Sequence, residues 1–274
     1  MFESLVNGRR ALEQPWVVFF FGLLFTLISF AGAFVALREE ISLLMLFFWT
    51  LLTVPLLMEV LLRSEGEFRA THPFFEVHRR VIEVYVLLFF GLFVGYVLLS
   101  FLLPPTLASE VFSFQQEYVL NTKGLSLETF ESFLEGLPPI SLEQTLAILS
   151  KNLFLALLAF GLSFLYGASS MFLVVLNGSV FATFLVEMIK LIATTKEQAI
   201  KIVLLFSIHL IPEVTGFLIA AIAGGLLSQA VLSKKWKKAI ARDAFKLFAL
   251  SICCIVLAAI LEVYVSTRLF HSLF

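Results

Sequence analysis

The chain has 274 residues, of which 60% are hydrophobic and only 14% are charged, and its mean hydropathy is +1.01. Soluble globular domains carry about 25% charged residues, so this composition excludes an ordinary soluble domain and predicts an integral membrane protein embedded in the lipid bilayer. The formal net charge of -1 gives no electrostatic reason to expect a nucleic-acid partner.

Several apolar runs reach the roughly 20 residues that a helix needs to cross a bilayer. The first two form a tight hairpin around the polar turn at residues 38–40. The third ends at the Pro104–Pro105 pair, because proline lacks an amide hydrogen and fixes φ. The fourth follows a capping box at Ser141 and Gln144 and ends at Gly167. We predict an all-α, polytopic transmembrane bundle with about seven spans: Trp16–Leu37, Ile41–Leu62, Val81–Leu103, Leu146–Tyr166, Met171–Ile192, Lys201–Leu232 and Leu247–Ser266.

Basic residues cluster before the first span, between the second and third, and between the sixth and seventh. With seven spans these clusters fall on one side of the membrane, which the positive-inside rule predicts to be cytoplasmic. We therefore expect a multi-pass protein of the cell membrane with its N-terminus in the cytoplasm and its C-terminus outside. The clusters are Arg9 and Arg10; Arg63, Arg69, Arg79 and Arg80; and Lys234, Lys235, Lys237, Lys238, Arg242 and Lys246.

The loop between the third and fourth spans, residues 104–145, is acidic. It holds Lys123 as its one cation against several glutamates, and residues 126–135 read as a short amphipathic helix with its apolar side chains on one face. We interpret this outer loop as a solvated lid, and docking of a membrane or extracellular protein partner is the alternative.

The sixth span carries His209, Pro212 and Glu213 near its middle, where charged groups are costly. The spacing of four places His209 and Glu213 on one helical face. Pro212 removes one helical hydrogen bond and frees the carbonyl of Ile208, which predicts a helix broken at Pro212. Three interpretations stay open: a polar pair that locks a kink, a cation site that takes a divalent metal on His209 and Glu213, and a site for proton or substrate handling.

Other polar residues in apolar runs extend this hypothesis. Asn152 and Asn177 lie in the fourth and fifth spans, and we expect both to converge with His209 and Glu213 in the core. Glu83 and Lys151 are interpreted as surface residues, whereas for Glu59 and Glu262 a local role and a site are both open. A face of small residues continues beyond Glu213 and predicts a close helix contact, within the protein or in a homodimer; its members are Gly216, Ala220 and Gly224.

The ordered combination of Asn152, the Asn177–Gly178 pair, and His209 with Glu213 and the small run after them resembles the stage II sporulation protein M family. The resemblance covers about Val81–Leu269. It implies a five-span core at residues 81–274, with the outer loop between its first two spans and an added hairpin at residues 1–80. The family usually has Pro before the His and Gly or Ser after it, whereas this chain has Ile208 and Leu210.

The resemblance implies a non-catalytic membrane scaffold or membrane-remodelling component. The family's namesake looks like a scaffold that recruits peptidoglycan-degrading partners during spore engulfment, but relatives occur in organisms without that process. A small-solute or ion permease is the alternative, because a scaffold does not explain a buried charged pair. A metal-dependent intramembrane hydrolase ranks lower, since the sequence has no His-Glu-x-x-His and no Gly-x-Ser-x-Gly motif, and His209 is the one histidine within a predicted span.

Overall fold

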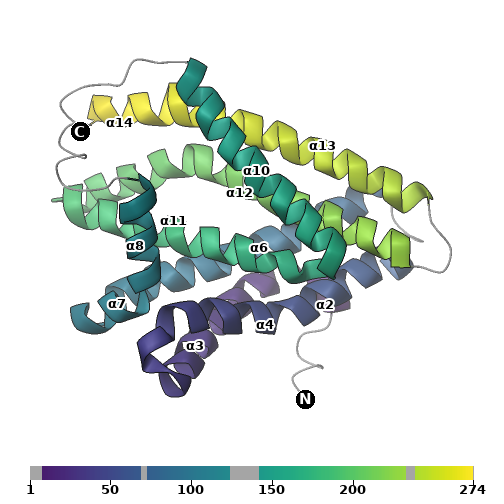
Figure 1. Ribbon diagram of the computed structural model, residues 1–274, viewed down its shortest axis with the longest axis horizontal. Helices are drawn as coiled ribbons and strands as arrows, with labels where there is room; N and C mark the ends of the chain where they lie inside the picture. The colour runs from purple at the N-terminus through teal and green to yellow at the C-terminus, as the bar shows by residue number, and fades with distance from the viewer. Residues whose placement is uncertain (1–7, 69–72, 124–141, 233–237, 274) are drawn as a thin grey trace.

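The computed structural model describes residues 8–68, 73–123, 142–232 and 238–273, and every regular element in these ranges is helical. Seven helices are long and apolar enough to cross a membrane, which confirms the predicted multi-pass bundle. Most of them run along the long axis of the molecule (Figure 1). The spanning helices are α3 (Trp16–Ala36), α4 (Ile41–Arg63), α6 (Phe74–Leu102), α10 (Leu142–Tyr166), α11 (Met171–Ile192), α12 (Lys196–Leu232) and α13 (Lys238–Leu261).

Shorter helical segments connect the spans or lie at their ends. They are α2 (Gly8–Glu13), η1 (Arg38–Glu40), η2 (Ser64–Phe68), α7 (Pro105–Val111), α8 (Ser113–Lys123), η3 (Gly167–Ser170), η4 (Glu262–Ser266) and α14 (Thr267–Leu273). The predicted amphipathic helix at residues 126–135 lies outside the described residues, as does the lysine-rich segment at 233–237.

The predicted stop signals act where expected. α6 ends at Leu102, and α7 begins at Pro105, where the missing amide hydrogen costs no helical bond. α10 ends before Gly167, which has a φ of 70° that side-chain-bearing residues rarely adopt. Four spans begin earlier than predicted, because hydropathy marks only the apolar part of a helix whose backbone hydrogen bonds continue into its polar end.

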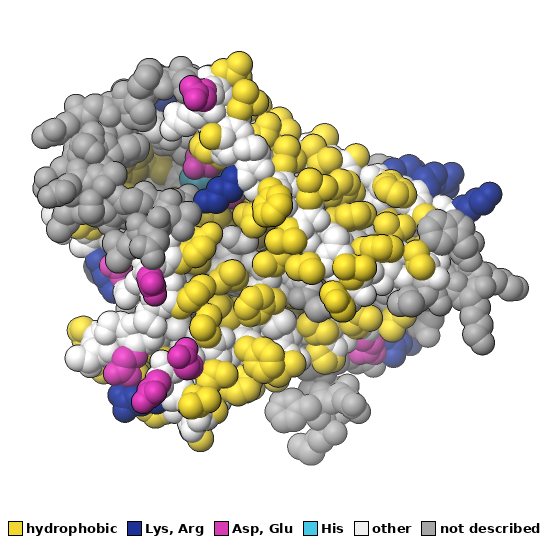
Figure 2. All heavy atoms as spheres, in the orientation of Figure 1, with side chains coloured by type: hydrophobic (Ala, Val, Ile, Leu, Met, Phe, Trp, Pro, Cys, Tyr) yellow, Lys and Arg dark blue, Asp and Glu magenta, His cyan; other side chains and the backbone are white. Residues whose placement is uncertain are grey.

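The surface separates into an apolar middle and charged ends. Figure 2 shows hydrophobic side chains across the middle of this face and charged side chains toward its two ends. Large hydrophobic residues such as Phe20, Leu51, Phe154 and Leu204 are exposed along the spans. In a bilayer such side chains face lipid tails at no cost, which fits a multi-pass membrane protein.

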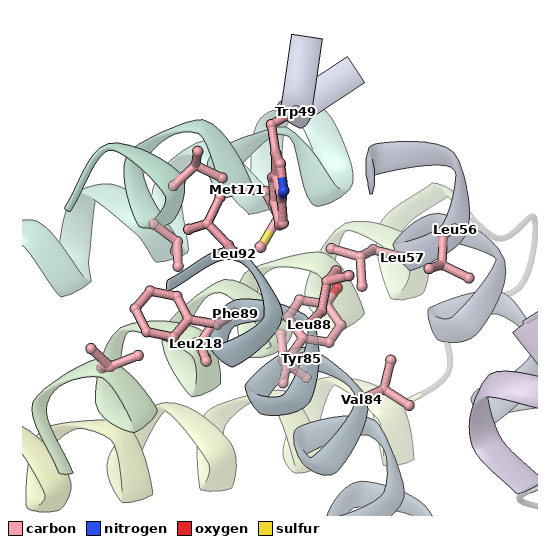
Figure 3. Close-up of a cluster of buried hydrophobic side chains, with 14 of the residues drawn as sticks. Trp49, Leu56, Leu57, Val84, Tyr85, Leu88, Phe89, Leu92, Met171 and Leu218 are labelled. Carbon is pink, nitrogen blue, oxygen red and sulfur yellow. The ribbon is translucent and has the colours of Figure 1, made fainter. Parts of the chain in front are cut away.

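One hydrophobic core joins the first two spans to the later ones. Figure 3 shows Trp49 of α4, Tyr85 and Leu88 of α6, Met171 of α11 and Leu218 of α12 gathered in this core, and all five are at most 1% exposed. The amino-terminal hairpin is therefore packed directly on the other helices.

Two glycines bring α3 and α6 into close contact. A Cβ atom on Gly22 would meet the carbonyl oxygen of Leu88, and one on Gly91 would meet that of Phe19. The Trp49 indole also donates to the carbonyl of Gly22 at 3.3 Å. Small residues allow such backbone approach between helices in a membrane.

The sixth span is a single helix, so the predicted break at Pro212 is wrong. α12 is helical from Lys196 to Leu232 with Pro212 inside it. A proline removes one backbone hydrogen bond. The residues on either side of it, His209, Leu210, Glu213 and Val214, are buried, and their packing supports the helix as it continues through Pro212.

The helices α7 and α8 lie at one end of the bundle, on the left in Figure 1. Arg38, in the turn between the first two spans, pairs with Glu110 of α7 at 3.1 Å. Gln115 of α8 accepts a hydrogen bond from Ser42 at 2.7 Å and donates one to Ser179 at 3.2 Å. These contacts attach α8 to α4 and α11, and we call this end of the molecule the α8 end.

Candidate functional site

A cavity of about 600 Å³ opens among the helices at the α8 end. Its walls come from α8, the first half of α10, residues 177–188 of α11, the first half of α12, and the segment from η4 into α14. Figure 2 shows a hollow on this face, with a histidine and charged side chains beside it. The polar lining residues are Tyr118, Gln144, Lys151, Asn152, Asn177, His209, Glu213, Glu262, Ser266 and Thr267.

Three titratable side chains meet on the wall of this cavity. His209 and Glu213 lie one turn apart on α12 and are 8% and 6% exposed, and Glu262 of η4 faces them from the end of the seventh span. One ligand atom from each, an imidazole nitrogen and two carboxylate oxygens, lies within 4.8 Å of the other two. An imidazole and two carboxylates at this separation form a donor set for a cation.

The imidazole of His209 is held by two neighbours. Its Nδ1 forms a hydrogen bond of 2.9 Å with the Oγ of Ser266, which is buried. The ring of Phe206 packs edge-on against the imidazole with the ring centres 5.1 Å apart. This hydrogen bond and the ring contact fix the orientation of the imidazole on the cavity wall.

Glu262 and Ser266 are presented by a π-helical turn. The five residues of η4 follow α13 with this wider geometry, and the Thr267 hydroxyl donates to the carbonyl of Glu262 at 2.8 Å. Single π-turns inside α-helices occur often at functional sites. The sequence alone leaves both a local role and a site open for Glu262. The pattern that indicates a site is a carboxylate in an apolar run with a serine one turn later.

Both predicted asparagines also line the cavity. Asn152 of α10 is 6% exposed. Asn177 of α11 donates through Nδ2 to the carbonyl of Leu173 at 3.0 Å. The structure thus places Asn152, Asn177, His209 and Glu213 around one space, with Lys151, which is exposed, on the same wall.

Two other glutamates from apolar runs lie away from the cavity. Glu59 accepts hydrogen bonds from the amide of Gly8 at 3.0 Å and from Arg63 at 2.8 Å. Glu83 pairs with Arg80 at 3.2 Å and Arg79 at 3.4 Å. Both carboxylates are held by local partners near the end of the bundle opposite α8.

The small residues beyond Glu213 pack against α10 and α13. A Cβ atom on Gly224 would meet the carbonyl oxygen of Phe160, and one on Gly216 would lie 2.7 Å from Cγ1 of Ile255. Ser251 of α13 donates to the carbonyl of Gly216 at 2.7 Å, and Ala220 between them is fully buried. The close contact formed by this face is therefore within the protein.

Comparison with known proteins gives the family. The sequence model of the family described as stage II sporulation protein M matches residues 84–267. The chain belongs to the stage II sporulation protein M family. No curated protein and no solved structure is significantly similar to the chain.

The stage II sporulation protein M region contains the whole candidate site. His209, Glu213 and Glu262, together with Ser266 and both cavity asparagines, fall inside the matched residues, which run from α6 through η4. The helices α3 and α4 precede the match. The cavity is thus a feature of the family region of this chain.

Proposed function

We propose that this member of the stage II sporulation protein M family is a non-catalytic permease that binds a small cationic solute in the cavity at the α8 end. The observation that supports the proposal is the meeting of His209, Glu213 and Glu262 on the wall of that cavity. A scaffold needs exposed faces for its partners, whereas this arrangement provides an accessible space whose wall carries two carboxylates and an imidazole, with Lys151 nearby.

The electrostatics of the site favour a cation. Two carboxylates within 4.8 Å of each other repel, and the apolar side chains of Phe181, Phe184 and Phe206 in the cavity wall reduce the screening that water would provide. A positively charged solute removes this repulsion and forms ion pairs that are stronger than in bulk water.

The packing of α12 suggests how a solute is retained. On the far side of the cavity the small face of α12 closes against α10 and α13, and the rings of Phe160 and Phe248 contact each other there in a tilted arrangement with their centres 4.5 Å apart. The space is lined at its other side by α8 and the start of α10. Release to the opposite side of the membrane requires α10, α12 and α13 to separate, as in alternating access around a fixed site.

The positive-inside rule supplies an orientation for this proposal. The described members of the basic clusters, among them Arg10, Arg79 and Arg242, lie toward the end opposite α8 (Figure 1), so that end faces the cytoplasm and the cavity faces the outside of the cell membrane. The N-terminus is then cytoplasmic and the C-terminus external.

Transport by purified protein in liposomes tests the proposal. The probes are Mn²⁺, followed by quenching of an internal dye, and radiolabelled putrescine as an organic cation. We expect uptake of at least one probe, with the rate reduced at least about tenfold by Glu213→Gln. Glu187→Gln is the matched control, because Glu187 lies on α11 beside Lys190 and outside the cavity. Absence of uptake of both probes would contradict the permease.

The second candidate is the scaffold, which is favoured by membership of the family. Its partner would be a membrane or extracellular protein that docks on residues 104–145, or a second copy of the chain. Cross-linking in membranes through Ser113→Cys, an exposed position at the start of α8, tests this candidate. Cross-linked partners that persist in Glu213→Gln, combined with absent solute uptake, would favour the scaffold over the permease.

We assign no catalytic role to the residues of this site. A hydrolase needs a general base beside its activated nucleophile, whereas in the proposed site His209, Glu213 and Glu262 all serve to bind the cation. The Glu213→Gln variant would then lose solute binding as well as uptake, and a variant that binds solute normally would contradict this assignment of roles.

A further inference from the structure

We infer that the cation bound in the cavity is a divalent transition-metal ion, held by Nε2 of His209 and by the carboxylates of Glu213 and Glu262. This inference rests on the proposed cation-binding cavity and narrows its ligand to one chemical class.

The donor atoms distinguish among cations. Calcium and magnesium bind through oxygen ligands, and an organic ammonium group can only donate a hydrogen bond to the imidazole nitrogen, whereas a transition metal forms a coordinate bond with it. One imidazole with two carboxylates suits zinc, manganese or ferrous iron, which accept mixed nitrogen and oxygen donors. His209 therefore favours a transition metal over the other cations.

The separation of the donors also fits. Metal–ligand distances near 2.1 Å place tetrahedral donors about 3.4 Å apart. The three candidate donor atoms already lie within 4.8 Å of one another, so side-chain rotations that close the gaps by up to roughly 1.4 Å are enough. Both glutamates can make this adjustment because their long side chains turn without moving the helices.

The hydrogen bond between His209 and Ser266 supplies the kind of support that a metal-binding imidazole usually has. A histidine ligand usually donates its second ring N–H to an oxygen, which fixes the tautomer and the ring orientation. Here Nδ1 meets Ser266 Oγ at 2.9 Å, and Ser266 comes from the same π-turn as Glu262. One turn of the chain thus supplies a ligand and positions another.

The charge of the donor set matches a divalent ion. As ligands, the carboxylates of Glu213 and Glu262 carry two negative charges, which a divalent cation cancels at a depth where charge is costly, and Lys151 on the same wall adds one positive charge outside the donor set. Three protein ligands leave at least one coordination position directed into the cavity. Water or a transported ligand can occupy that position, so the ion can exchange through the cavity.

Metal analysis of the full chain in detergent tests the inference. The purified protein is incubated with Zn²⁺, Mn²⁺ or Co²⁺, desalted, and measured by inductively coupled plasma mass spectrometry. We expect about one ion per chain in the wild type and in Glu187→Gln. His209→Ala and Glu262→Gln should lose it, and Ser266→Ala should bind about 10- to 100-fold more weakly.

The outcomes separate this inference from the proposed function. No stoichiometric metal in the wild type, together with putrescine uptake that depends on Glu213, would overturn the metal site and leave the permease standing. Stoichiometric metal without uptake of either probe would support the site and contradict the permease. Metal retained by His209→Ala or Glu262→Gln would show that the ion binds elsewhere and would overturn the inference.

A spectrum of the wild type covers the case in which a variant fails to fold. Each variant is compared with the wild type by size-exclusion elution in detergent before its metal content is interpreted. Co²⁺ bound to the wild type should give visible absorption bands of a nitrogen- and oxygen-ligated centre, and Zn²⁺ should displace them. A spectrum identical to that of aqueous Co²⁺ would overturn the inference without use of any variant.

Discussion

The two halves of α12 differ in how their neighbours surround them. Residues 216–228 are all buried, because glycine and alanine let α10 and α13 approach to backbone contact. Residues 202–213 include buried and exposed positions, and His209 and Glu213 in this half line the cavity. Small side chains therefore let α10 and α13 pack closely around one half of α12, which we call the closed half. The polar side chains lie in the other half, which lines the cavity and which we call the cavity half.

The strongest way to break the closed half is to fill its tightest contact. Gly224→Leu would drive a side chain into the carbonyl of Phe160, and because backbone cannot yield as a side chain does, we expect a loss of more than about 3 kcal/mol. Gly161→Leu is the control, since a Cβ atom there meets nothing within 4 Å. Thermal unfolding in detergent measures both, and an equal loss in the two variants would contradict the close contact.

The cavity beside the other half of α12 is walled by α8, and Gln115 attaches α8 to its neighbours. Gln115→Leu would leave the buried hydroxyl of Ser42 without its partner and cut the link to Ser179. We expect a cost of about 2 kcal/mol and faster proteolysis of α8. Gln116→Leu is the neighbouring control, because Gln116 makes one long hydrogen bond of 3.4 Å to Glu187. Similar unfolding of the two variants would show that Gln115 is not the anchor.

The parts of this fold that sequence predicts are those set by local signals. Hydropathy located all seven spans, and Pro105 and Gly167 marked helix boundaries through backbone geometry that acts within one turn. The break at Pro212 was predicted wrongly, because tertiary packing on both sides outweighs one lost hydrogen bond.

Only part of the candidate site can be predicted from the sequence. His209 and Glu213 lie on the same helix, so their spacing of four predicts that they share one face. Glu262 and Ser266 join them only because α13 packs along α12 and ends in a π-turn, and no local pattern encodes that meeting. The contact between Gly22 and Gly91 could not be predicted from the sequence for the same reason, since the two residues lie on different spans.

A smaller effect sharpens the description of the closed half, where one polar contact lies among apolar ones. Ser251→Ala removes the 2.7 Å hydrogen bond to the carbonyl of Gly216, and we expect a loss of about 1 kcal/mol. Ser207→Ala on α12 is the control, because its hydroxyl bonds within its own helix, to Val203, at an exposed position. A loss no larger than the control's would mean that packing alone holds α13 against α12.

The smallest expected change in stability belongs to Glu213→Gln, in the cavity half. Glutamine keeps the shape of the side chain and one acceptor oxygen, and it removes the repulsion between Glu213 and Glu262, so we expect the free energy of unfolding of the metal-free protein to change by less than about 0.5 kcal/mol. Thermal unfolding in the presence of a chelator measures this.

The value of that variant is that it separates the two explanations of a buried charged pair. If His209 and Glu213 lock the helix, the charge is structural, and glutamine should destabilise the protein by several kcal/mol, as breaking a buried ion pair does. If the pair exists to bind a cation, the stability is unchanged while binding and uptake are lost. A polar group that can be neutralised without harm to the fold, at a depth where charge is costly, is retained for a ligand and not for the fold.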